Sequence, residues 1–251
     1  MRQFYPNWDN ALVAYATKCY NFQIMQEYIE DLTQTDLFSG IKLDEIPGLL
    51  DCLQIRHAKY IKGDLIIEEG SMVYDFGIIV SGHGRSIKWD EFSDRIIIIT
   101  LLKKGSVIGV MLAASLEHKS PVSVQAQDDV AVLFIPFDRV FTRCEKGCPC
   151  HDKLLRNYIN AVAEKGLVLH ERIDCLLKPT AREKILAYLT RVSSEQNKRT
   201  FAIPINRNEM AEYLNIERSS LSRELSSMKR DGLIDYHKNT FRLQSKKFLF
   251  P

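Results

Sequence analysis

The residues best suited to specific chemistry in this 251-residue chain are arginines and serines within one short stretch, residues 206–225. An arginine side chain can bond bidentately to guanine, and a serine hydroxyl can bond to bases or to phosphates. Grouped at the start of a helix, such side chains suit readout of the DNA major groove; the alternative is an ordinary solvated helix face. The candidate DNA-contacting residues of this stretch are Arg218, Ser219, Ser220, Ser222 and Arg223.

The apolar residues of the same stretch predict a helix–turn–helix that presents those side chains outward. Asn206 can cap the first helix by accepting a backbone N–H bond. Asn215 falls at the turn, where a left-handed backbone is needed and asparagine tolerates it. Met210 and Leu214, four residues apart, share one face of the first helix. The second helix is expected to be held in the core by Leu221, Leu225 and Met228.

A strand–turn–strand pattern follows the second helix. Residues 233–236 and 240–243 are strand-like, and they flank a short basic turn at residues 237–239. This pattern is typical of a wing beside a helix–turn–helix. We expect Lys238, at the tip of the wing, to contact the phosphate backbone of DNA.

A second candidate group is a run of thiols with one imidazole between residues 144 and 151. The spacing is not a standard zinc pattern, so no metal site is assigned, and inert or packing thiols are the preferred interpretation. Two alternatives stay open, a set of metal or cluster ligands and a redox-sensing pair, because the run precedes a helix N-terminus, which lowers thiol pKa values. The residues concerned are Cys144, Cys148, Cys150 and His151.

The elements that position these residues follow from the periodicity of apolar side chains. Residues 11–53 have helical spacing, interrupted at Ser39-Gly40, and residues 60–141 have short strand-like runs separated by glycine or charged turns. Such runs predict an antiparallel barrel or jelly roll. Residues 151–178 return to helical spacing, and Pro179 marks a boundary. We therefore predict three parts: residues 1–150, residues 151–178 and residues 179–251.

The long helix of residues 151–178 carries an apolar face that one small domain rarely covers. The simplest partner is a second copy of the same helix across a two-fold axis, which predicts a homodimer. Packing of the helix on its own barrel is the alternative.

Composition limits the classes of partner and function that this chain can have. The chain has a net charge of +2 and ordinary hydrophobic and charged fractions of 45% and 26%. Residues 179–251 hold 14 Lys and Arg against 8 Asp and Glu, so only this part is basic enough to suggest a polyanionic partner. No run of residues is long enough to span a bilayer and no export signal is evident, which predicts a cytoplasmic protein without a membrane partner. The scattered histidines and the lack of nucleotide or hydrolase motifs argue against an enzyme.

The order of β-roll, long helix and winged helix–turn–helix resembles the cyclic-AMP receptor/fumarate-nitrate regulator (CRP/FNR) family of bacterial transcription factors. The resemblance covers roughly residues 32–243 and is carried by residues 62–70, 81–82, 105–109, 181–186 and the helix–turn–helix. It implies an α+β fold with an N-terminal cyclic-nucleotide-binding-like β-roll, a cupin-like jelly roll. It also implies a homodimer that binds near-palindromic promoter DNA, responds to an effector in the roll and contacts RNA polymerase.

Residue by residue, the resemblance assigns roles within the helix–turn–helix. Arg223 matches the arginine that reads a guanine, and Arg218 and Ser219 match positions that contact bases and backbone. Arg207 matches a phosphate-contacting position. At Ser219 several family members have a glutamate that reads cytosine, so a family half-site cannot be transferred to this chain.

The effector site departs further from the family pattern. Nucleotide-binding members have a Gly-Glu pair and an Arg-Ser pair that hold the ribose and the cyclic phosphate, whereas this chain has Gly109-Val110 and Ser120-Pro121. Burying a phosphate without a cation is costly. We therefore predict that the chain does not bind cyclic AMP tightly, and we assign no cofactor. Either an unknown small molecule is the effector or side chains fill the pocket. A ligand-binding module that does not bind DNA is the remaining alternative for the whole chain. The candidate pocket residues are Ile108, Gly109, Val110, Met111, Leu112, Ser120, Pro121, Ser123 and Tyr158.

Overall fold

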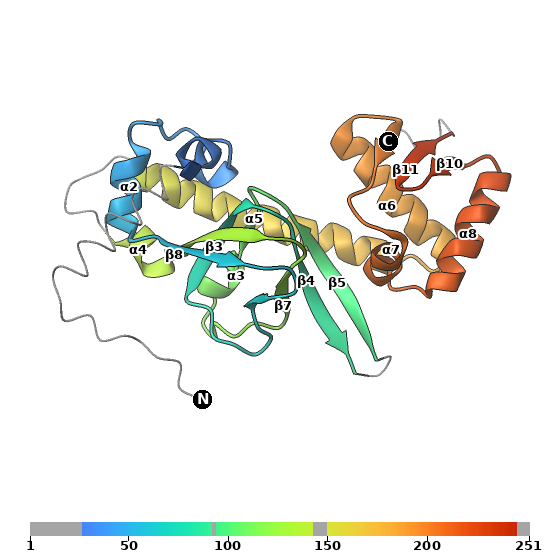
Figure 1. The fold of residues 1–251 in the computed structure, drawn as a ribbon, viewed down its shortest axis with the longest axis horizontal. Helices are drawn as coiled ribbons and strands as arrows, with labels where there is room; N and C mark the ends of the chain where they lie inside the picture. The colour runs from blue at the N-terminus through green and yellow to red at the C-terminus, as the bar shows by residue number, and fades with distance from the viewer. Residues whose placement is uncertain (1–26, 92–93, 143–149, 245–251) are drawn as a thin grey trace. The chain divides into compact units, whose positions relative to one another are not determined.

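The computed structural model describes residues 27–91, 94–142 and 150–244 of the chain. The chain forms two compact units (Figure 1). The first unit comprises Met1–Arg85 and Leu102–Glu164, and the second comprises Ser86–Leu101 and Lys165–Pro251. Each unit is therefore assembled from two separate segments of sequence.

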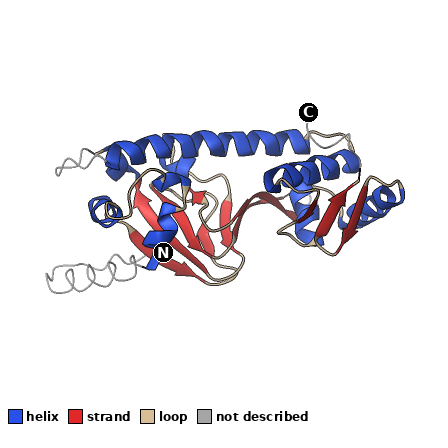
Figure 2. Ribbon diagram, turned by 90° about the horizontal axis from the view of Figure 1, so that it is seen from above, coloured by secondary structure: helices blue, strands red, loops and turns tan. Residues whose placement is uncertain are grey.

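The β-roll consists of two four-stranded sheets, whose strands are drawn red in Figure 2; most of β4 and β5 belongs to the second unit by sequence. One sheet has the order β1-β8-β3-β6 and the other the order β2-β7-β4-β5. The strands are β1 (Arg56–Tyr60), β2 (Leu65–Ile67), β3 (Asp75–Ser81), β4 (Gly84–Asp90), β5 (Arg95–Leu102), β6 (Val107–Ile108), β7 (Ser123–Ala126) and β8 (Val130–Pro136).

Two apolar strands, β3 and β8, form the centre of this roll. β8 is a continuous apolar run whose side chains are almost all buried, and β3 pairs with it antiparallel, with Ile78 opposite Leu133. Gly77 of β3 has Val132 and Ile108 against its backbone; a Cβ atom at Gly77 would lie 2.7 Å from Val132 Cγ1. Glycine at this position therefore permits the close approach of the strands.

Short helices cover the roll and close its core. They are a helix over residues 27–33, η1 (Asp36–Phe38), α2 (Ile46–Leu53), α3 (Val110–Ala113) and α4 (Phe137–Phe141). The predicted interruption at Ser39-Gly40 is confirmed, while residues 11–26 of the predicted helical region lie outside the described residues. The long helix α5 (Cys150–Leu176) begins in this unit, where Leu154 and Tyr158 join the buried cluster.

The second unit contains the C-terminal winged helix–turn–helix. Its elements are α6 (Ala181–Gln196), β9 (Thr200–Ala202), α7 (Arg207–Leu214), α8 (Arg218–Arg230), β10 (Ile234–His237) and β11 (Thr240–Leu243), and its three strands have the order β10-β11-β9. A capping box starts α6, where the Thr180 hydroxyl accepts the Glu183 N–H. The predicted fold class, with its β-roll, long helix and winged helix–turn–helix, is confirmed.

The strands begin earlier than the predicted strand-like region of residues 60–141, because β1 starts at Arg56. The polar side chains of Arg56, His57 and Lys59 dilute the apolar pattern of this strand. Among the residues with a described structure, no helix combines the length and apolar character that crossing a bilayer requires.

Candidate nucleic-acid interface

The first helix of the helix–turn–helix, α7, begins at a capping box. Asn206 Oδ1 accepts the N–H groups of Asn208 at 2.9 Å and Glu209 at 3.1 Å, and Glu209 Oε2 accepts the Asn206 N–H at 2.9 Å. These bonds satisfy backbone donors that the first turn of a helix leaves without partners. The predicted cap at Asn206 is confirmed.

The turn between α7 and α8 depends on a left-handed residue. Asn215 has φ 48°, as predicted, and its N–H donates to Glu212 O at 3.4 Å. The next residue, Ile216, donates its N–H to Ala211 O at 3.1 Å, and Ala211 is buried. The small side chain at position 211 allows α8 to cross α7 closely.

The second helix, α8, has one buried face and one exposed face. Leu221, Leu225 and Met228 are buried in the core of the second unit, which confirms their predicted role. On the other side of the helix, Ser220 is half-buried and the remaining candidate side chains are exposed. The exposed ones are Arg218, Ser219, Ser222 and Arg223.

Hydrogen bonds orient the arginines on this exposed face. Arg218 donates from Nε to Asn208 Oδ1 at 3.0 Å and from Nη1 to the Ser222 hydroxyl. Arg223 donates from Nη2 to the Ser220 hydroxyl at 3.2 Å. Because each guanidinium has five N–H donors, both arginines keep donors for a ligand. Asn208 was not predicted to belong to this face.

The wing is tied to the helix–turn–helix by Arg207. Its guanidinium lies 4.7 Å from the ring centroid of Phe241 and 5.1 Å from that of Tyr236, and its Nη2 donates to Lys238 O at 2.6 Å. Burial lowers the pKa of Arg207. Lys238 has φ 49° and is exposed at the turn between β10 and β11. The structure thus gives Arg207 a packing role beyond the predicted phosphate contact.

A second arginine, on α6, holds α8 in place. Arg182 of α6 bonds through Nε to Glu224 Oε1 at 2.5 Å and through Nη2 to Asp231 Oδ2 at 2.7 Å. Arg182 and Glu224 are 42 residues apart, so no local spacing in the sequence indicates this pairing. The two pairs hold both the middle and the end of α8 against α6.

The residues predicted to line an effector pocket are divided between two buried clusters of the first unit. Val110 and Tyr158 belong to one cluster, and the Tyr158 hydroxyl donates to Val110 O at 2.5 Å; burial raises the pKa of Tyr158 to about 12. Ile108 and Leu112 pack in the other cluster. The structure therefore brings Val110 and Tyr158 together but separates them from the second pair.

The other candidate pocket residues lie around α3 and β7. Gly109 precedes α3 with φ 69°, and the buried Ser120 donates its hydroxyl to Val122 O at 2.6 Å. The Ser123 hydroxyl accepts the N–H of Glu69 at 3.0 Å. Two residues are exposed, Met111 and Pro121.

The thiol and imidazole run is only partly described by the structure. Cys144 and Cys148 lie outside the described residues. Cys150 is buried in the first turn of α5 against the core of the first unit, and burial lowers the pKa of the neighbouring His151. Within residues 27–91, 94–142 and 150–244, no three His, Cys, Asp or Glu side chains are grouped as a metal site would require.

Comparison with known proteins agrees with this geometry. A model of the Crp-like helix-turn-helix domain matches residues 183–249, and a model of the cyclic nucleotide-binding domain matches residues 57–146. The chain thus has the domain composition of a class that joins a nucleotide-binding-type roll to a Crp-like helix-turn-helix.

Two curated relatives of this chain are transcriptional activators. The transcriptional activator protein FnrL of Cereibacter sphaeroides is 36% identical over 66 residues, which cover 23% of this chain and 27% of that protein. The transcriptional activator protein anr of Pseudomonas aeruginosa is 28% identical over 119 residues, which cover 45% of this chain and 47% of that protein. The chain thus matches about a quarter and about half of the lengths of these two relatives.

Solved structures share the fold at low identity. The c-di-GMP responsive global regulator CLP of Xanthomonas campestris has a TM-score of 0.64 at 16% identity, over 79% of this chain and 99% of that one. A CooA mutant from Carboxydothermus hydrogenoformans has a TM-score of 0.61 at 17% identity, over 85% of this chain and 97% of that one. The chain therefore has, in the same order, the two domains that characterise CRP/FNR regulators, and it shares the fold of these solved structures.

Proposed function

We propose that this chain is a sequence-specific DNA-binding regulator of transcription that reads the major groove with α8. The observation that carries the proposal is the division of α8 into two faces. Leu221, Leu225 and Met228 fix one face in the core, and the opposite face presents oriented arginine donors beside serine hydroxyls. In a helix–turn–helix this is the face that meets base edges, while residues such as Arg207 and Lys238 of the wing region meet phosphates.

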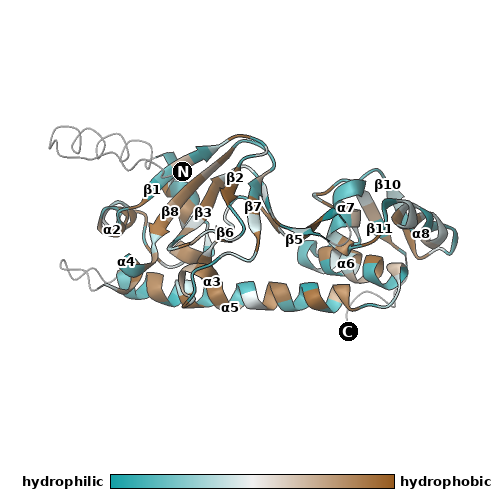
Figure 3. Cartoon of the chain, turned by 90° about the horizontal axis from the view of Figure 1, so that it is seen from below, coloured by the Kyte–Doolittle hydropathy of each residue, from teal (hydrophilic) through white to brown (hydrophobic). Residues whose placement is uncertain are grey.

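We further propose that the regulator works as a homodimer paired along α5. Several large apolar side chains of this helix are exposed, and Figure 3 shows the hydrophobic bands along it. They are Ile159, Leu167, Val168 and Ile173, and the exposed Leu177 directly follows the helix. Packing against a second α5 would bury them, and a two-fold dimer would match a near-palindromic DNA site.

The effector proposed for the roll is a small molecule other than cyclic AMP. Val110 takes the place where family members have the ribose-binding glutamate, and it is buried in an apolar cluster. Ser120 takes the place of the phosphate-binding arginine, and its hydroxyl is occupied by the Val122 carbonyl. Neither position supplies the charge that a cyclic phosphate requires.

The direct test is selection of duplex DNA from a random pool, followed by titration of the selected site. We expect a near-palindromic site, affinity that falls steeply with salt, and loss of base preference in Arg223→Ala. Lys42→Ala, which removes an exposed lysine of the first unit, is the matched control and is expected to bind as the wild type does. Failure to enrich any site, or unchanged base preference in Arg223→Ala, would contradict the proposal.

A further inference from the structure

Part of the β-roll sequence folds with the DNA-binding unit. Residues 86–101, from β4 and β5, belong to the second unit together with the end of α5 and the helix–turn–helix. Ile87 and Ile98 are buried in the same apolar cluster as Tyr188, Tyr213 and the side chains of the wing. We call residues 86–101 the β4–β5 segment.

The centre of this contact is a buried arginine on α5. Arg172 is only 4% exposed, and its Nη2 donates to Ile98 O of β5 at 3.0 Å. The same guanidinium lies 3.9 Å from the ring centroid of Tyr213, in the first helix of the helix–turn–helix. One side chain of the long helix therefore contacts both the β4–β5 segment and α7.

Arg172 is buried at a cost. Its Nε and Nη1 have no hydrogen-bond partner, and no carboxylate among the described residues pairs with it. Burial lowers the pKa of Arg172, and the nearby Tyr213 opposes this only in part. A guanidinium is an expensive group to bury without a counter-charge, so an apolar residue would serve better if filling space were its purpose.

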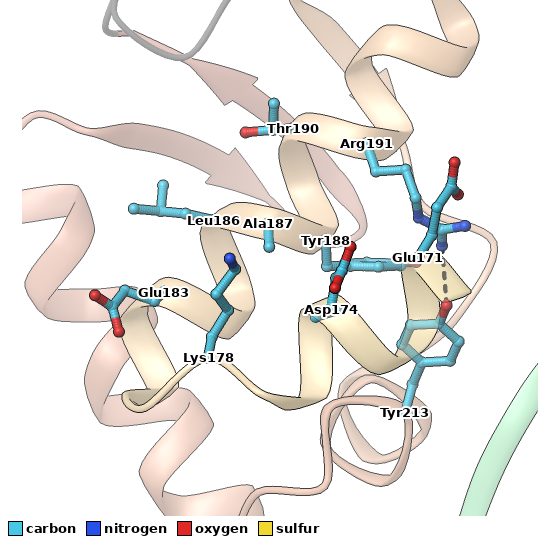
Figure 4. A pocket seen from close by; sticks show the side chains of 11 residues that line it. Glu171, Asp174, Lys178, Glu183, Leu186, Ala187, Tyr188, Thr190, Arg191 and Tyr213 are labelled. Carbon is cyan, nitrogen blue, oxygen red and sulfur yellow. Dashed lines mark hydrogen bonds between the residues drawn. The ribbon is translucent and has the colours of Figure 1, made fainter. Parts of the chain in front are cut away.

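Tyr213 is held from its other end by Arg191. Arg191 donates from Nη2 to the Tyr213 hydroxyl at 3.0 Å, the bond drawn dashed in Figure 4, and pairs with Glu195 at 3.2 Å. Tyr213 also lines a groove of about 580 Å³ between the end of α5 and α6. The position of the Tyr213 ring, and so of α7, is therefore set by two arginines from two different helices.

A second ionic contact joins the β4–β5 segment to the base-reading helix. Arg95 Nη1 lies 2.6 Å from Glu217 Oε1, and Glu217 is the N-cap residue directly before α8. An unpaired carboxylate beside Arg218 and Ser219 would repel DNA phosphates. Arg95 neutralises that carboxylate when the segment is docked, so the docked arrangement favours an anionic ligand on α8.

We propose that Arg172 is a positioning residue for DNA binding, which docks the β4–β5 segment on the helix–turn–helix so that Arg95 neutralises Glu217 at the start of α8. The inference rests on the proposed function, DNA binding by α8. Arg172 itself touches no DNA in this proposal. Its effect passes through Ile98 and Tyr213, and it makes the segment a working part of the DNA-binding unit.

The test combines hydrogen exchange with DNA binding in the full chain. Arg172→Met keeps the length of the side chain and removes the donor to Ile98 O. We expect the backbone of residues 95–101 to lose exchange protection while α8 keeps it, and the affinity for the selected duplex to fall by about tenfold, as for loss of one charged hydrogen bond. The salt dependence should not change, because no phosphate contact is lost. Arg156→Met, which removes an exposed arginine of the same helix, is the control.

Two further variants separate positioning from general stability. Arg172→Lys should not restore affinity, since an ammonium lacks the planar fork that stacks on Tyr213 and reaches Ile98. Arg95→Gln, at a partly exposed ion pair, should fold normally and weaken binding by about threefold, and this loss should disappear when it is combined with Arg172→Met. Additive losses in that double variant would overturn the proposal.

Other outcomes are equally decisive. Wild-type affinity in Arg172→Met despite loss of protection in the segment would overturn the positioning role, and loss of protection throughout α6–α8 would show a purely structural residue. If the wild-type chain itself selects no DNA site, the proposed function fails. Hydrogen exchange without DNA still measures whether the β4–β5 segment is docked. Failure of the proposed function can therefore be distinguished from failure of the docking role of Arg172.

Discussion

Substitutions at Arg207 can distinguish a role in contacting DNA from a role in packing the wing. Its guanidinium packs on Phe241 and Tyr236 and donates to the backbone oxygen of Lys238, which leaves other N–H groups for a phosphate. A charged hydrogen bond contributes about 1.5–3 kcal/mol, and the lower end applies because water can replace the donor at an exposed turn. A cation over aromatic rings adds about 0.5–2 kcal/mol. We expect Arg207→Ala to lower the free energy of unfolding by about 2 kcal/mol.

Arg207→Lys keeps the positive charge and loses the fork and the stacking. We expect it to lower the free energy of unfolding by about 1 kcal/mol while retaining most DNA binding. The measurements are urea unfolding followed by circular dichroism, and DNA affinity at several salt concentrations. The control is Lys238→Ala, which removes an exposed ammonium but keeps the carbonyl that Arg207 uses. It should reduce the slope of log affinity against log salt concentration by about 0.9, the value of one phosphate contact. The free energy of unfolding should not change. If both Arg207 variants unfold as the wild type does, the packing role is refuted.

Three other predictions follow from the described contacts. Asn206→Ala should destabilise the second unit by about 1 kcal/mol, because α7 loses its cap; Asn206→Asp should not, and equal unfolding midpoints for the two variants would contradict this. Gly77→Ala should destabilise the first unit by about 1–3 kcal/mol, since the added Cβ meets Val132 in a packed sheet; an unchanged thermal midpoint would show that the strands can separate without cost. Burial lowers the pKa of His57 and of His151, so both fold as neutral rings. The unfolded chain then binds protons more readily, and stability should be full above a pH of about 6.5 and fall as the pH drops toward the folded pKa values. Urea unfolding at several pH values should show a flatter profile in the His57→Asn, His151→Asn double variant, and an unaltered profile would rule out these two rings as the source.

Features set by neighbouring residues could be predicted from the sequence alone. The cap at Asn206 and the left-handed turn at Asn215 depend on residues within four positions, and both are confirmed. The buried side of α8 follows from the spacing of Leu221, Leu225 and Met228, and its exposed side follows by elimination.

Features set by distant residues could not be predicted. Arg172 belongs to an amphipathic helix, where periodicity places a charged residue in solvent, yet β5 and α7 bury it. Arg182 finds its carboxylates on another helix, and Arg95 pairs with a residue 122 positions away. The packing of Arg207 on the wing likewise requires the strand pairing that follows it. In each case a long side chain has several reachable partners, and only the folded chain selects one.

The candidate effector site shows a different limit. Departures at Val110 and Ser120 argue against a cyclic phosphate from residue chemistry alone, and the structure adds that both positions are engaged within the protein. A binding partner of unknown chemistry has no sequence signature to search for, so the pattern excludes one ligand without naming another.

The assembly of the second unit from two stretches of sequence has a consequence for protein engineering. Chimeric regulators are made by joining the sensor of one protein to the DNA-binding module of another at a single junction. In this chain, a junction at Pro179 would transfer α7, α8 and the wing to the recipient but leave Arg172 and residues 86–101 behind. The transplanted Tyr213 would then pack against a foreign strand. Exchange of DNA specificity in this chain therefore requires two junctions in the roll and a third within α5, so that the interlocking parts are inherited together.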